Sequence, residues 1–127
     1  MPYRSINPAT GEVLKTFKEH TTQEMMDALA QADKAFVSWA AHPIEERAKI
    51  IARAVQLFLE HKSELARLAT LEIGKRIAEG RGEIELSAAI LQYFADNAAT
   101  FLAPKAIKSP VGNAQLEFSP LGVTLKG

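Results

Sequence analysis

The chain of 127 residues has the length of one domain and an ordinary globular composition, 47% hydrophobic and 24% charged. Its 15 basic residues balance 15 acidic ones, so no basic field favours nucleic acid or an anionic membrane as a partner. The absence of cysteine excludes disulfides, thiolate metal sites and a cysteine nucleophile within this sequence. The first residues form no apolar signal region, and no apolar run is long enough to cross a bilayer, so a cytoplasmic protein is expected.

Residues 3–17 are expected to form a β-hairpin. Two short extended runs flank the sequence NPATGE, in which Asn7 can form an Asx turn, Pro8 fixes its own φ and Gly11 can adopt a positive φ. The alternative is a loose N-terminal tail without strand pairing.

Residues 21–102 show the apolar periodicity of a helical layer, and its first helix has the clearest start signal. Thr21 and Glu24 match the capping box, in which each side chain can bond the backbone amide of the other residue. His42-Pro43 is expected to end this helix and begin the next, because proline disfavours helix in the preceding residue and is tolerated at a first helical position. The apolar face of the first helix consists of residues spaced by three or four: Met25, Leu29, Ala32, Phe36 and Trp39.

Three further helices are expected before Leu102. The third should span about residues 63–73 and end at Gly74 in the left-handed conformation. The fourth should run from residue 77 or 81 to residue 100, because Gly80 and Gly82 make its start ambiguous. The second helix carries an apolar stripe of Ile44, Ala48, Ile51, Val55 and Phe58. The inward residues expected on the fourth are Ile84, Ala88, Leu91, Tyr93, Phe94, Ala95 and Ala98.

The pattern changes after Leu102, where proline and glycine interrupt the sequence. The runs KAIKS and AQLEFS are expected to form a hairpin over residues 103–119, with its turn at Gly112-Asn113. Because its strand edges would be unpaired, the hairpin is either an aggregation risk or an arm that joins another sheet. Residues 120–127 alternate like a strand whose neighbours do not follow. The expected fold class is therefore mainly α with short β-hairpins, an α+β fragment that forms a single partial domain.

A search for catalytic and nucleotide-binding motifs finds no GxGxxG, Walker loop, HExxH or CxxC. His20, His42 and His61 lie at predicted helix boundaries, where solvated residues are expected rather than general bases. The stretch LEIGKR could suggest a phosphate site at Lys75. A helix that ends at Gly74, with Lys75 beside its negative C-terminus, explains the same residues more simply.

Two other groups invite a functional interpretation and have a plainer one. Trp39 and the pair Tyr93-Phe94 lie on stripes needed for packing, so they are expected in the core rather than in a stacking platform. An acidic cluster could suit a cation, although a solvated helix face is the favoured interpretation: Glu79, Glu83 and Glu85. No residue is assigned a catalytic, cofactor-binding or metal-binding role.

Taken in order, four stretches resemble the start of the NAD(P)-dependent aldehyde dehydrogenase superfamily, and most closely its succinate-semialdehyde dehydrogenase branch. They are INPATGE, ADKAFVSWAAHPIEERAKII, LATLEIGKRIAEGRGEIELSAAILQYFADNA and FSPLGV, and they cover Ile6 to about Thr124. The resemblance implies the N-terminal helical part of that α/β fold without its complete Rossmann-like domain, with residues 120–127 as the first strand of the dinucleotide-binding sheet. In that family the oxyanion-hole asparagine, cofactor loops, general-base glutamate and nucleophilic cysteine come later in the chain.

The resemblance also implies an oligomeric state for the family and restricts the activity expected of this chain alone. Residues 105–119 resemble the family's oligomerisation arm, so a homo-oligomer is expected, and the remainder of the enzyme is a possible partner. Glu83 lies near the position where some members hold a structural alkali cation. This chain alone is expected to be inactive and to bind no cofactor, whereas the full-length family uses NAD or NADP. The alternative is a non-catalytic helical module for protein interaction or oligomerisation.

Overall fold

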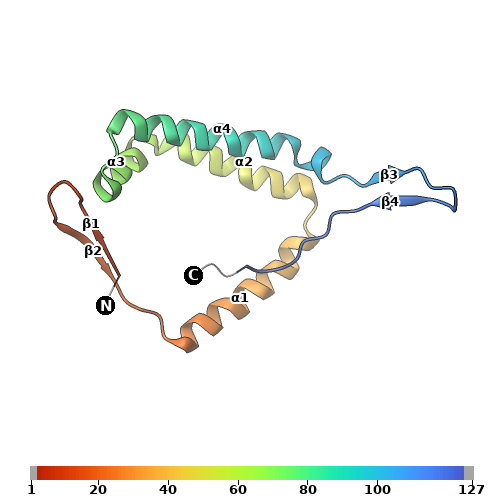
Figure 1. Cartoon of the computed structure of the whole chain (residues 1–127), viewed down its shortest axis with the longest axis horizontal. Coiled ribbons are helices and arrows are strands. Elements are labelled where there is room, and N and C mark those ends of the chain that lie inside the picture. The colour runs from red at the N-terminus through yellow and green to blue at the C-terminus, as the bar shows by residue number, and fades with distance from the viewer. Residues whose placement is uncertain (1–2, 125–127) are drawn as a thin grey trace.

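The computed structural model describes residues 3–124, which form four helices and two separate antiparallel hairpins (Figure 1). The predicted class, mainly α with short hairpins, is confirmed. The elements in chain order are β1 (Tyr3–Ile6), β2 (Val13–Phe17), α1 (Thr22–Ala41), α2 (Ile44–Glu60), α3 (Lys62–Ile73), α4 (Ile77–Phe101), β3 (Lys105–Ile107) and β4 (Ala114–Leu116).

The first hairpin forms as predicted, with β1 antiparallel to β2. Asn7 Oδ1 accepts a hydrogen bond from the Ala9 amide at 2.9 Å, and Gly11 has a φ of +75°, so the Asx turn and the glycine act together. The hairpin is tied to α3 by Ser5 Oγ, which donates to Glu72 Oε1 at 2.7 Å. Strand β1 therefore lies beside α3, whose Glu72 is 67 residues further along the chain than Ser5.

Local signals set the helix ends. The Glu24 amide donates to Thr21 Oγ1 at 3.2 Å, and the Thr21 amide donates to Glu24 Oε2 at 2.7 Å, which completes the predicted capping box. Gly74 has a φ of +70° and ends α3 in the left-handed conformation. The fourth helix begins at the earlier of the two expected positions, so Gly80 and Gly82 both lie inside it.

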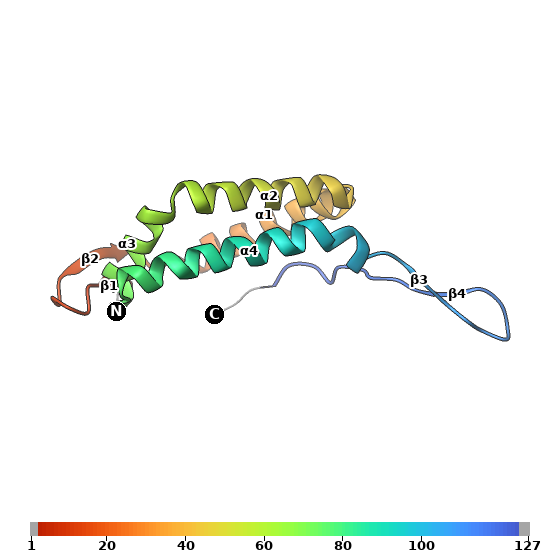
Figure 2. The ribbon, with the colours of Figure 1, turned by 90° about the horizontal axis from the view of Figure 1, so that it is seen from above.

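The core lies where α4 packs against α2 and, near its own N-terminus, against α3 (Figures 1 and 2). Val55 of α2, Ala66 of α3 and Ala88 of α4 are 6%, 0% and 2% exposed. Gly80 is also buried, because the α4 backbone approaches α3 at Ala66. The small side chains at these positions let the helices pack closely.

The first helix diverges from the others, and no described residue of α1 is buried (Figure 1). The core positions expected for Trp39, Tyr93 and Phe94 are therefore wrong, since these side chains are 38%, 55% and 54% exposed. Periodicity correctly placed them on helix faces. Among residues 3–124, however, no element covers those faces closely enough to exclude solvent.

The second hairpin projects beyond the end of α4 (Figure 2). β3 pairs with β4 antiparallel, from Lys105 opposite Leu116 to Ile107 opposite Ala114. Both strands are shorter than expected, and residues 108–113 form the connection, so the predicted two-residue turn is wrong. Ser109-Pro110 lies within this connection, and a proline cannot donate to a strand ladder.

Residues 117–124 follow β4 without regular structure. The strand expected over residues 120–127 is not formed in its described part, and its last three residues lie outside the described range. Within residues 3–124, none of the helices combines the length and apolarity that crossing a membrane requires.

Candidate functional site

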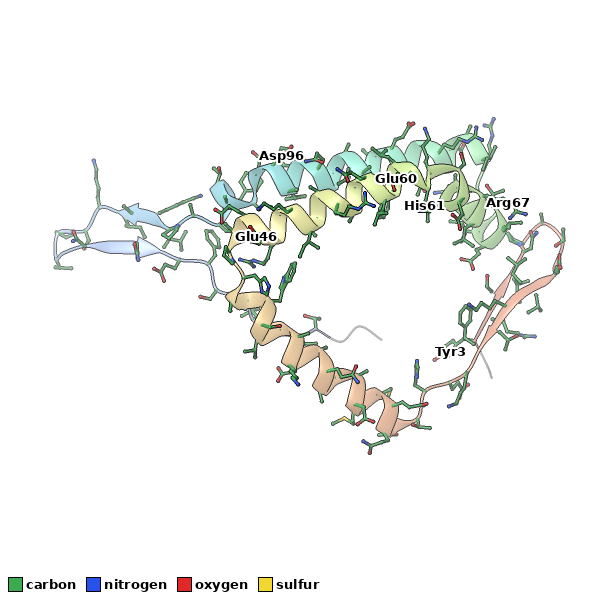
Figure 3. The ribbon with its side chains drawn as sticks, turned by 180° about the vertical axis from the view of Figure 1, so that it is seen from behind. Tyr3, Glu46, Glu60, His61, Arg67 and Asp96 are labelled. Carbon is green, nitrogen blue, oxygen red and sulfur yellow. The ribbon has the colours of Figure 1, made fainter. Side chains whose placement is uncertain are left out.

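The three histidines lie at helix boundaries on the surface, as predicted. His42 Nδ1 lies 2.7 Å from the carbonyl oxygen of Ser38, and His61 Nδ1 lies 3.0 Å from Glu64 Oε2. Figure 3 shows His61 at the corner between α2 and α3. All three side chains are exposed, so this geometry supports local capping and pairing rather than general-base catalysis.

The stretch LEIGKR does not form a phosphate loop. Gly74 ends α3. The side chain of Lys75 is 24% exposed, and its ammonium group pairs with the Glu83 carboxylate of α4. The lysine thus joins the α3–α4 turn to the first turns of α4. The interpretation of Gly74 as a helix end is confirmed.

Each glutamate of the acidic cluster at the start of α4 forms an ion pair with a different basic side chain. Glu79 lies 3.7 Å from Arg76, Glu83 pairs with Lys75, and Glu85 Oε1 accepts from Lys62 Nζ at 2.7 Å. The hydrogen bond from Lys62 lowers the pKa of Glu85. In residues 3–124 no group of three acidic, histidine or cysteine side chains is arranged to hold a metal ion. A cation at Glu83 stays a prediction.

Sequence reasoning missed a hollow of about 580 Å³ at the foot of the second hairpin, called here the arm pocket. Its wall is formed by α2, by the end of α4 and by both chain segments that lead into and out of the hairpin: Ile44, Arg47, Ala99, Leu102, Pro104 and Phe118. Arg47 is half-buried, and its Nε has no hydrogen-bond acceptor among residues 3–124. A signal was present in the sequence, because Arg47 interrupts the apolar stripe of α2 between Ile44 and Ile51.

The comparisons with known proteins agree over nearly the whole chain. The profile of the aldehyde dehydrogenase family matches residues 1–126. The chain is 44% identical over 124 residues to a succinate-semialdehyde dehydrogenase [NADP(+)] of Deinococcus radiodurans, covering 98% of this chain and 26% of the relative. It is 42% identical over 92 residues to a glutarate-semialdehyde dehydrogenase of Pseudomonas putida, covering 72% of this chain and 19% of that protein.

Solved structures give the same result. Gox0499, studied for cofactor and substrate selection, superposes with a TM-score of 0.92 at 32% identity, covering 95% of this chain and 27% of that one. A Streptococcus pyogenes succinic semialdehyde dehydrogenase in complex with NADP+ gives a TM-score of 0.84 at 32% identity, covering 89% and 25%. The chain spans about a quarter of the length of these relatives. Its sequence and its fold show that it belongs to the aldehyde dehydrogenase family.

Proposed function

We propose that this chain acts as the N-terminal segment of an NAD(P)-dependent aldehyde dehydrogenase that oxidises succinate semialdehyde or a closely related semialdehyde acid. The observation that carries the proposal is the 44% identity to the Deinococcus radiodurans relative, which spans 98% of this chain. A glutarate-semialdehyde dehydrogenase at 42% identity supports the wider class of substrate, an aldehyde that also carries a carboxylate.

The chemistry belongs to residues outside this segment. Aldehyde oxidation by a covalent route needs a thiolate nucleophile and donors that stabilise the oxyanion, and NAD or NADP supplies the hydride acceptor when bound. This sequence has no cysteine, and Lys62 and Lys75, two basic residues beside α4, are paired with the carboxylates of Glu85 and Glu83. The 127-residue chain alone is therefore proposed to be inactive.

What the segment supplies is a scaffold. α2, α3 and α4 form the packed layer, whereas α1 leaves an apolar face open, with Met25 and Leu29 50% and 38% exposed. We assign that face to the remainder of the enzyme. The strands of the second hairpin have free edges, so we assign residues 105–119 to pairing with a second subunit.

A chimera tests the proposal. This chain replaces the matching N-terminal quarter of the Deinococcus radiodurans enzyme, and NADPH formation is measured with succinate semialdehyde and with glutarate semialdehyde. The chimera is expected to turn over, and the isolated chain is not. A matched chimera carrying Ala66→Asp should lose activity, because it places a charge at a fully buried position.

Two outcomes would contradict the proposal. One is a soluble, folded chimera without activity towards either aldehyde, and the other is turnover by the isolated chain of verified mass. The oligomerisation claim has its own test, since light scattering that shows a monomer across a wide concentration range would contradict it.

The alternative function is a non-catalytic helical module. The exposed apolar residues of α1 and α4 favour this alternative, because exposed apolar patches are typical of surfaces that bind another protein. An inactive chimera combined with a stable complex between the isolated chain and a different protein would favour this reading.

A further inference from the structure

Helix α1 and the segment 121–124 form a surface with two hollows. One hollow, of about 420 Å³, is lined by α1 and by residues 123–124. The other, of about 550 Å³, is lined by α1 and by residues 121–123. Leu29 and Val123 belong to both walls, so the segment 121–124 runs between the two hollows.

This surface combines exposed apolar side chains with unused backbone groups. Met25 lines the first hollow and is 50% exposed, and Met26 lines the second and is 57% exposed. Within the described part of the chain, no backbone hydrogen bond joins residues 121–124 to another segment. Such a surface suits strands that pair with the segment and insert apolar side chains into the hollows.

The comparison with longer relatives identifies the polypeptide that fits this surface. Gox0499 superposes on 95% of this chain with a TM-score of 0.92, although this chain covers only 27% of it. The arrangement of these elements is therefore the one that exists in a protein nearly four times as long. A surface with that geometry is shaped for the polypeptide that follows it there, whereas a second copy would require no such match.

The rest of this chain holds the surface in place without that polypeptide. The core between α2, α3 and α4 is already formed within residues 3–124, with Val55, Ala66 and Ala88 buried. A preformed surface loses less conformational entropy on binding than a disordered one, so association does not need a covalent link.

We propose that this chain docks noncovalently, as a separate molecule, with the polypeptide that corresponds to the remaining three-quarters, approximately, of its relatives, and that strands of that polypeptide cover both hollows. The inference rests on the proposed function, which takes the same polypeptide as the rest of the enzyme. It goes further because it makes the two hollows beside the segment 121–124 the docking site and requires no peptide bond between the two parts.

The test co-produces the 127-residue chain with a tagged Deinococcus radiodurans enzyme that lacks its matching N-terminal quarter. The two polypeptides are expected to purify together in equal amounts, as measured by intact mass. In a second set of cells, a variant chain and the parent chain compete for the same tagged polypeptide, and the ratio of their masses in the purified complex is measured.

The variants address each hollow separately. Met25→Asp places a carboxylate in the first hollow and Met26→Asp places one in the second, so each should compete about tenfold less well than the parent, because docking would bury an unpaired charge. Val37→Asp is the matched control, since Val37 is an apolar residue of α1 that is 65% exposed and lines neither hollow. It should compete within about twofold of the parent. Circular dichroism verifies that each variant keeps its helices.

The inference is overturned if the tagged polypeptide purifies without the chain, if it is insoluble although the chain is co-produced, or if either methionine variant competes as well as Val37→Asp. A chain that binds only further copies of itself, seen by light scattering, also overturns it. The covalent chimera separates this failure from that of the proposed function. An active chimera whose separate parts do not associate contradicts only the docking, whereas a soluble, folded and inactive chimera contradicts the proposed function.

Discussion

The crossing of α3 and α4 gives the sharpest stability prediction, because two glycines of one helix differ only in their surroundings. A Cβ added at Gly80 would lie 3.2 Å from the Ala66 carbonyl oxygen and 3.4 Å from the Ala66 Cα and Cβ. A Cβ added at Gly82 would meet no other atom within 4 Å. Both glycines lie inside α4, so Gly80→Ala and Gly82→Ala form a matched pair.

The magnitudes follow from two opposing effects. Replacing a glycine inside a helix by alanine stabilises it by about 1 kcal/mol. At Gly80 the new methyl group also presses on the backbone of a fully buried residue, and overpacking of this kind costs about 1–3 kcal/mol. The free energy of unfolding should therefore rise by about 1 kcal/mol in Gly82→Ala and should be about 1–3 kcal/mol lower in Gly80→Ala than in Gly82→Ala.

The assay is urea unfolding of both variants, followed by far-ultraviolet circular dichroism and fitted with a common slope. Because both changes alter the unfolded chain in the same way, their difference isolates the contact with Ala66. Equal stability of the two variants would refute the inference that close packing at Gly80 holds α3 on α4.

Three more predictions concern single interactions. Thr21→Ala removes the helix cap and should destabilise α1 by about 1 kcal/mol, seen as faster amide exchange in its first turn. Gly74→Ala forces a positive φ and brings Cβ to 3.0 Å from Pro8, so unfolding should become easier by about 1–2 kcal/mol. Because the pKa of Glu85 is lowered in the folded chain, Glu85 stabilises the fold at pH values above its unfolded-state pKa, and this contribution is lost as the pH falls through the folded-state pKa. Lys62→Met removes the hydrogen bond and should return the pKa of Glu85 to its ordinary value, measured by carbon-13 titration.

The helix boundaries could be predicted because their signals are local. Thr21 and Glu24 lie within one turn of each other, and Pro43 and Gly74 act through their own backbone preferences. The register of the second hairpin depended on which residues of a glycine- and proline-rich connection would pair. That choice rests on cross-strand contacts rather than on residue type, so Gly112-Asn113 was misleading.

The burial of the aromatic residues, unlike the helix boundaries, could not be predicted from local sequence signals. Tyr93 contacts Phe94 and Phe101, with ring centroids 5.5 and 5.8 Å apart, so these rings pack on one another while remaining half exposed. An apolar stripe identifies residues that share a face, and only tertiary structure tells whether another element covers that face. The arm pocket was missed for the same reason, since its wall joins α2 to segments more than fifty residues away.

The contrast between α1 and the other helices supports the assignment to a larger assembly. α1 has the capping, the spacing and the apolar face of a core helix, yet none of its described residues is buried. Helices in proteins owe most of their stability to packing of the apolar face rather than to intrinsic propensity. The apolar face of α1 is therefore suited to more cover than the short segment 121–124, which lies along it, provides. Because the relatives are about four times as long, their remaining polypeptide is the natural source of that cover, and covering α1 is what should fix its orientation relative to α2.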